Sequence, residues 1–139
     1  MKQAQIKALY PNIKDGYEGR LGPDGKIDPT AYHILEIPSH SIDGCEFQVS
    51  LMYFNPPFDS LTVIRFHFAG VDFSGCRDKT VADLMKRFGP HPRESDGGTI
   101  KYKQWFGPVN NVTFDELNSP THSFDFSLSH SGAPGTYLE

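Results

Sequence analysis

Apolar and polar residues alternate with a period of two along several stretches of the chain, the pattern of half-buried β-strands. The alternation is clearest from Cys45 to Phe54 and from Leu61 to Ala69, where one face of each segment is almost wholly apolar. The segment between them, residues 55–60 (NPPFDS), contains two prolines and predicts a loop that joins an antiparallel pair. Further strands are expected at 32–37, 100–106, 112–114 and 122–128.

One segment has the periodicity of a helix instead. The apolar side chains at positions 81, 84, 85 and 88 would form a single stripe along it. Thr80 is a natural N-cap, Asp83 can pair with Arg87, and Gly89 followed by Pro90 predicts the end. A helix of about residues 81–88 is too short to be stable alone, so it must pack against a sheet.

The order of strands, one helix and more strands predicts an α+β fold. We expect a mainly antiparallel sheet with one short helix packed on one face, in a single domain of residues 1–139. Residues 1–31 are predicted to be loop-rich, with a turn at Asp24-Gly25 that favours a small hairpin, and 129–139 to be a loose tail. The run of helix, Phe88-Gly89-Pro90, loop and strands resembles modules of bacterial outer-membrane assembly lipoproteins and toxin-immunity proteins.

Charge and composition narrow the function classes. The 13 Lys and Arg residues are outnumbered by 17 Asp and Glu, which disfavours a nucleic-acid partner. No apolar stretch reaches the roughly 18 residues of a membrane span, and the first residues do not have the pattern of a secretory signal. With only two cysteines, Cys45 and Cys76, we expect separate thiols in a cytoplasmic protein without a membrane partner.

No residue pattern points to catalysis, a metal or a cofactor. The histidines have none of the compact spacings of metal ligands; they are His33, His40, His67, His91, His122 and His130. Cys76 is the one candidate nucleophile, with His67 and Asp72 as imagined helpers. It is predicted to lie several residues before the helix, beyond the reach of its dipole, so a buried or idle thiol is the favoured interpretation.

The alternation also predicts a polar sheet face. If the ring of Tyr102 and those of the core phenylalanines point to the helix, one indole and several polar side chains point away from it. The polar set is Glu46, Gln48, Arg65, His67, Lys101, Lys103, Trp105 and Asp125. An aromatic among charged groups is typical of protein interfaces, so we hypothesise that this face, centred on Trp105, binds another protein. The alternative is that the first thirty residues fold over Trp105 and bury it.

A second candidate surface is acidic. Asp115 and Glu116, together with Asp125, could meet a basic partner, or form only a solvated loop. These observations favour a non-catalytic binding protein, such as an immunity protein or inhibitor that occludes a toxin or enzyme. Two alternatives stay open: a small enzyme or ligand-binding domain with a pocket between sheet and helix, and an assembly component of a larger complex.

Overall fold

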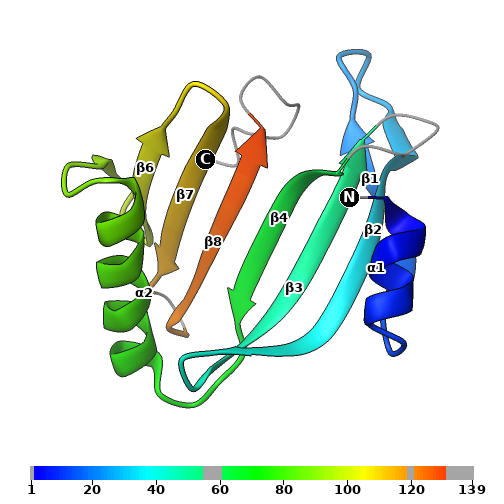
Figure 1. Ribbon diagram of the computed structural model, residues 1–139. Helices are drawn as coiled ribbons and strands as arrows, with labels where there is room; N and C mark the ends of the chain where they lie inside the picture. The colour runs from blue at the N-terminus through cyan, green and yellow to red at the C-terminus, as the bar shows by residue number, and fades with distance from the viewer. Residues whose placement is uncertain (1, 55–60, 119–120, 131–139) are drawn as a thin grey trace.

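The computed structural model describes residues 2–54, 61–118 and 121–130. It has the predicted α+β fold, with one eight-stranded antiparallel sheet and two helices (Figure 1). The elements are α1 (Gln3–Leu9), β1 (Lys14–Leu21), β2 (Ile27–Ile42), β3 (Cys45–Phe54), β4 (Leu61–Phe68), α2 (Phe73–Phe88), β5 (Arg93–Asp96), β6 (Ile100–Phe106), β7 (Asn110–Leu117) and β8 (Ser123–His130).

The sheet consists of two four-stranded antiparallel meanders. Its strand order is β1-β2-β3-β4-β8-β7-β6-β5, so each strand within β1–β4 and within β5–β8 pairs with its neighbour in sequence. Helix α2 leads from β4 to the far edge of the sheet, and the second meander returns to pair β8 with β4. In this seam Phe66 is opposite Phe126 and His67 is opposite Asp125. Among the described strands, this one pairing joins the two halves of the sheet.

The first thirty-one residues are far more regular than predicted. They form α1, β1 and the start of β2, and the predicted turn closes the β1–β2 hairpin. Gly25 has a φ of 76°, and the backbone N–H of Lys26 donates to Asp24 Oδ1 at 3.0 Å. The sequence of β1 shows no alternation of apolar and polar residues, because this strand lies at the edge of the sheet, where no apolar face is needed. It contains glycines and exposed polar residues instead.

Helix α2 ends where predicted but begins at Phe73, about two turns earlier than expected. Gly89, with a φ of 116°, follows the last helical residue, and its N–H donates to the Met85 carbonyl at 2.9 Å. The N-cap is Asp72, whose side chain accepts from the Gly75 N–H at 3.1 Å, so Thr80 lies inside the helix. The first turns carry a glycine and several polar residues, so the apolar stripe begins only at Val81 and gave no earlier signal.

Both helices pack on the same face of the sheet, over one aromatic core. Phe47 lies at its centre with 1% of its surface exposed and meets four other rings edge-on. Those rings are Phe66, Phe68, Phe124 and Phe126, with centroids 5.5–6.2 Å away. A smaller cluster around Met52 and Val63 lies on the other face. The aromatic core thus spans the seam between the meanders.

The two cysteines are not separate thiols, as the sequence led us to expect, but form a disulfide. Cys45 opens β3 and Cys76 lies in the first turn of α2, with their Cα atoms 5.8 Å apart. The early start of α2 explains the difference, because it brings Cys76 down onto the sheet beside the β2–β3 turn. The bridge ties α2 to the first meander.

Two predicted features fall on residues outside the described part. The loop at 55–60 and the tail from 131 onward are not described. Residues 129 and 130, placed in the tail by the sequence analysis, are the last residues of β8.

Candidate functional site

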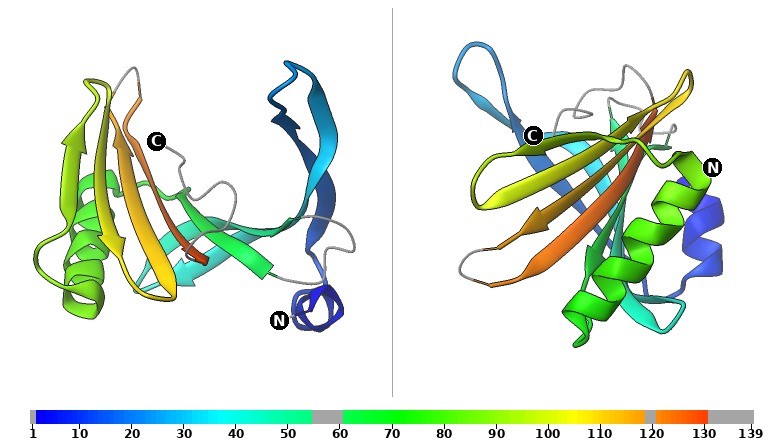
Figure 2. Two further views of the ribbon diagram at one scale, coloured as in Figure 1. Left: turned by 90° about the horizontal axis from the view of Figure 1, so that it is seen from above. Right: turned by 90° about the vertical axis from the view of Figure 1, so that its left-hand side faces the viewer.

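The face of the sheet opposite the helices is concave and polar. Figure 2 shows both halves of the sheet bending away from the side that carries α1 and α2. Alternation in the observed register directs these side chains to the concave face: Glu36, Gln48, Ser50, Arg65, His67, Tyr102, Thr113, Asp115, Asp125 and Ser127. Gln48 donates to Glu36 at 2.6 Å across β2 and β3. We call this set the concave polar face.

Three titratable side chains form a row across the centre of the concave polar face. His67 on β4 is opposite Asp125 on β8, which is opposite Asp115 on β7. His67 Nδ1 is hydrogen-bonded to Asp125 Oδ1, and the two side chains are 46% and 30% exposed. Arg65, two residues before His67, shares this side of β4 and is opposite Ser127. Four of the residues singled out from the sequence are therefore brought together.

The carboxyl group of Asp115 is unusual within this row. Burial, together with the charge of Asp125 on the next strand, raises its pKa to about 6. Three weaker effects lower the pKa but do not cancel this rise. They are the charge of Arg65, a hydrogen bond with the backbone of Asp115 itself, and the charge of His67. On the β6 side Asp115 faces Tyr102. The row can therefore change its charge near pH 6, which a carboxylate in water cannot do.

Replacing Asp115 with asparagine should stabilise the protein at pH 7 by about 1–2 kcal/mol. The native carboxyl binds a proton more tightly than the unfolded one, so wild-type stability falls as pH rises from about 4 to about 6. The asparagine side chain carries no charge at either pH, so the variant should lack this fall. Urea unfolding at pH 4 and pH 7 measures the difference, which should be small at the lower pH.

A matched control for this measurement is Asp78→Asn on the exposed side of α2, where the side chain is 72% exposed. Its stability should follow the wild-type pH profile closely, because exposed ion pairs contribute little. If the stability of Asp115→Asn changes with pH in parallel with that of wild type, the pKa of the Asp115 carboxyl is not raised in the folded protein.

Four other predicted surface residues lie on the helix side of the sheet: Lys101, Lys103, Trp105 and Glu116. Glu46 alternates with the core residue Phe47 and lies on the same side of β3 as Gln48, as predicted. The placement of Trp105, Lys101 and Lys103 on the polar face was wrong, because β6 has the opposite orientation to the one expected. Lys103 is opposite Phe114 and Trp105 is opposite Val112, both core positions. Two lysines on one side of β6 suggested a solvent-facing side, but this strand lies near the edge, where lysines can reach water.

Trp105 is buried, with 7% of its surface exposed, so it is not the centre of a binding face. Its indole N–H donates to the Gly89 carbonyl at the C-terminal end of α2, at 2.8 Å. The helix end, rather than the first thirty residues, therefore covers it. Lys103 forms an ion pair with Glu94 on β5 at 2.6 Å.

Asp115 and Glu116 point to opposite sides of β7, so they form no joint acidic surface. Asp115 belongs to the concave polar face with Asp125, while Glu116 accepts from Arg77 of α2 at 3.4 Å. The acidic pair on the concave polar face is therefore Asp115 with Asp125.

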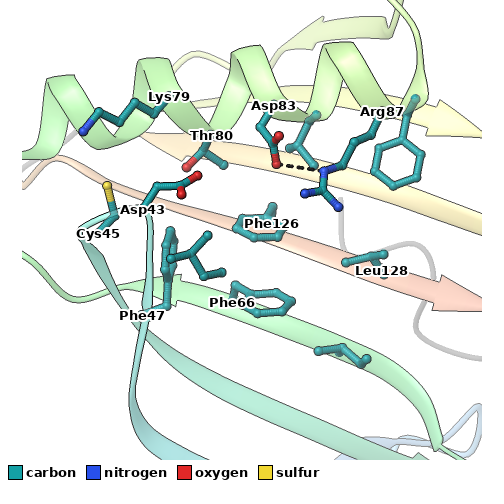
Figure 3. Close-up of a pocket in the computed structure, with 14 residues that line it drawn as sticks. Asp43, Cys45, Phe47, Phe66, Lys79, Thr80, Asp83, Arg87, Phe126 and Leu128 are labelled. Carbon is teal, nitrogen blue, oxygen red and sulfur yellow. Dashed lines mark ion pairs between the residues drawn. The ribbon is translucent and has the colours of Figure 1, made fainter.

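A second candidate site lies on the helix side, between α2 and the sheet. A cavity of about 310 Å³ opens there, with aromatic and aliphatic side chains on its floor and charged side chains of α2 along its rim (Figure 3). Phe66 and Phe126 stack on each other, with ring centroids 4.5 Å apart, and line the floor. A pocket between sheet and helix was expected only for the ligand-binding alternative. The aromatic residues of β3, β4 and β8 are the sequence signal that could have located it, and the sequence analysis did not use them in this way.

The structure also bears on the candidate chemistry of single residues. The Cys76 thiol is engaged in the disulfide and is not a free nucleophile. Within the described residues, no group of three or more His, Cys, Asp and Glu side chains is placed to hold a metal ion. His33 on β2 is instead hydrogen-bonded to Asp15 on β1. Of the helices in the described residues, none is long and apolar enough to cross a membrane.

Comparison with known proteins adds no further assignment. No protein-family model matches the chain, and neither a curated protein nor a solved structure shows significant similarity to it.

Proposed function

We propose that this chain is a binding protein without catalysis, whose concave polar face covers part of another protein. Its closest functional type would be an immunity protein or inhibitor, which blocks a toxin or enzyme by occupying its active site. The observation that carries the proposal is the row of His67, Asp125 and Asp115, with Arg65 beside it, on a concave sheet face that neither helix covers.

Several properties of this face support the proposal. Charges of both signs lie close together, so a partner can be recognised by the pattern of charge as well as by shape. The groups stand on paired strands rather than on loops, so little conformational freedom is lost on binding. A protruding segment of the partner suits a concave surface better than a flat one does. Arg65 is a residue type that often dominates binding energy in interfaces.

The test uses the folded chain as bait in a lysate, with Arg65→Glu as the diagnostic variant. Wild type should capture one dominant stoichiometric partner, and the reversed charge should weaken that complex at least about tenfold. The matched control is Lys86→Glu, an exposed charge reversal on α2, which should bind like wild type. Adding the wild-type chain to the purified partner should then inhibit the partner's activity.

Two results would overturn the proposal. The first is a partner that binds the wild type, Arg65→Glu and Lys86→Glu equally well, because binding would then not use the concave polar face. The second is a folded, monomeric wild type that captures nothing. Self-association of the purified chain at micromolar concentration, measured by light scattering, would favour the assembly-component alternative instead.

The cytoplasmic location expected from the sequence is part of this proposal, and the disulfide is an argument against it. Structural disulfides persist mainly in oxidising compartments. An inhibitor that acts in the cytoplasm would work with Cys45 and Cys76 reduced, whereas one that acts in an oxidising compartment would keep the bridge. The redox state of the two cysteines in the cell therefore distinguishes the two locations.

A further inference from the structure

Two mainly apolar cavities lie next to each other on the helix side of the sheet, between α1 and α2. The cavity beside α2, of about 310 Å³, adjoins a second cavity of about 240 Å³ beside α1. Ile64 and Phe66 of β4 line both cavities, so the two lie side by side along this strand, and we call them together the trough. Figure 1 shows the helices at opposite sides of this face, with β3 and β4 between them.

The floor of the trough is apolar and only partly covered. Ile64, Phe66 and Leu128 belong to the aromatic core on their inner sides but are neither fully buried nor fully exposed. Phe88 at the end of α2 is 40% exposed and Leu9 at the end of α1 is 65% exposed. Contiguous exposed apolar surface of this kind marks a binding site more often than scattered exposed residues do.

The rim beside α2 supplies a positive group that faces the floor. Arg87 donates through Nε to Asp83 at 3.0 Å. This bond does not use the N–H groups of the two terminal nitrogens of the guanidinium. Figure 3 shows the guanidinium projecting from α2 over the mouth of the cavity, toward Leu128. The side chain of Lys79 lies toward the other end of the cavity, which Asp43 and Cys45 also line. Asp83 and Arg87 pair with each other, so Arg87 can reach a ligand at this end only through the N–H groups of its terminal nitrogens.

We propose that this trough binds an amphipathic carboxylate with a linear acyl chain, such as a medium-chain fatty acid. The chain would lie along Phe66, Ile64 and Leu128, and the carboxylate would accept from the terminal nitrogens of Arg87. A planar guanidinium is suited to a carboxylate, because its N–H donors match both oxygens. An elongated chain is favoured over a compact ligand because the two cavities are adjacent along β4 and share Ile64 and Phe66. This site is independent of the concave polar face on the opposite side of the sheet.

The test is calorimetric titration of the full chain with dodecanoate, dodecanol and dodecylamine. Wild type should bind dodecanoate at least about fivefold more tightly than dodecanol or dodecylamine, because neither of these two headgroups can accept from both terminal nitrogens of Arg87. Arg87→Gln should weaken dodecanoate about five- to tenfold and leave dodecanol unchanged. Lys86→Gln, which removes an exposed charge from the next position of α2, should bind all three like wild type.

The proposal is wrong if wild type binds none of the three probes, or if dodecanol and dodecylamine bind as tightly as dodecanoate. It is also wrong if Arg87→Gln and Lys86→Gln weaken dodecanoate to the same degree, since the effect would then reflect net charge alone. Chemical-shift changes on adding dodecanoate should centre on Ile64, Phe66 and Leu128. Changes confined to the concave polar face would place the ligand elsewhere and overturn the assignment.

Discussion

Replacing Phe47 with alanine should lower the free energy of unfolding by about 3–5 kcal/mol. The side chain is 1% exposed and packs edge-on against four aromatic rings from β4 and β8. The substitution removes the buried apolar surface of the ring and also leaves a cavity that rigid aromatic neighbours cannot fill. Urea unfolding followed by far-ultraviolet circular dichroism measures the loss.

The matched control is Phe106→Ala on β6, where the ring is 60% exposed. Its cost should stay below about 1 kcal/mol, because most of that ring is in contact with water in the folded protein. Equal losses for the two variants would show that Phe47 is not the centre of the core.

Removing the disulfide should lower the free energy of unfolding by about 3–4 kcal/mol. The bridge joins residues 31 positions apart, and its loss allows the unfolded chain many more conformations. We expect this loss in a Cys45→Ala, Cys76→Ala double variant, measured by urea unfolding at pH 7. Wild type should lose a similar amount when a reducing agent is added.

The double variant is its own control for the reducing agent, which should not change its unfolding midpoint. Titration of thiols in the denatured wild type should find none before reduction and two after it. Two free thiols in the oxidised preparation, or a wild type indifferent to the reductant, would contradict the bridge.

Much of the sheet could be predicted from alternation, and the limits of that method have physical causes. The segment predicted from Cys45 to Phe54 is β3 to the residue, and 61–69 is β4 but for its last residue. Both strands lie at the centre of the sheet, with one side on the core, so burial imposes the pattern. Strand β1 lies at an edge and α2 begins with polar turns, so neither has an apolar pattern in those parts. Helix α1 places only Ile6 in the core, and one residue leaves no period.

The candidate site was half predictable for a related reason. Arg65, His67 and Asp125 were placed on the polar side correctly because the apolar side of their strands is unmistakable. In β6 both sides contain aromatic residues, so alternation alone left two orientations, and the lysines pointed to the wrong one. The orientation of β6 is fixed by its pairing with β7, which sets Trp105 opposite Val112. The register of this pairing cannot be read from a single sequence. The pairing of Cys45 with Cys76 likewise depends on where α2 begins.

The single seam between the two meanders has a consequence for how fast the chain folds. Within each meander every strand pairs with its neighbour in sequence, so these contacts close short loops. The seam instead joins residues such as His67 and Asp125, 58 positions apart, across the whole second half of the molecule. Pairings between distant segments are slow to find, and they raise the contact order on which folding rates depend. Formation of the β4–β8 seam, rather than of either meander, should therefore limit the folding rate.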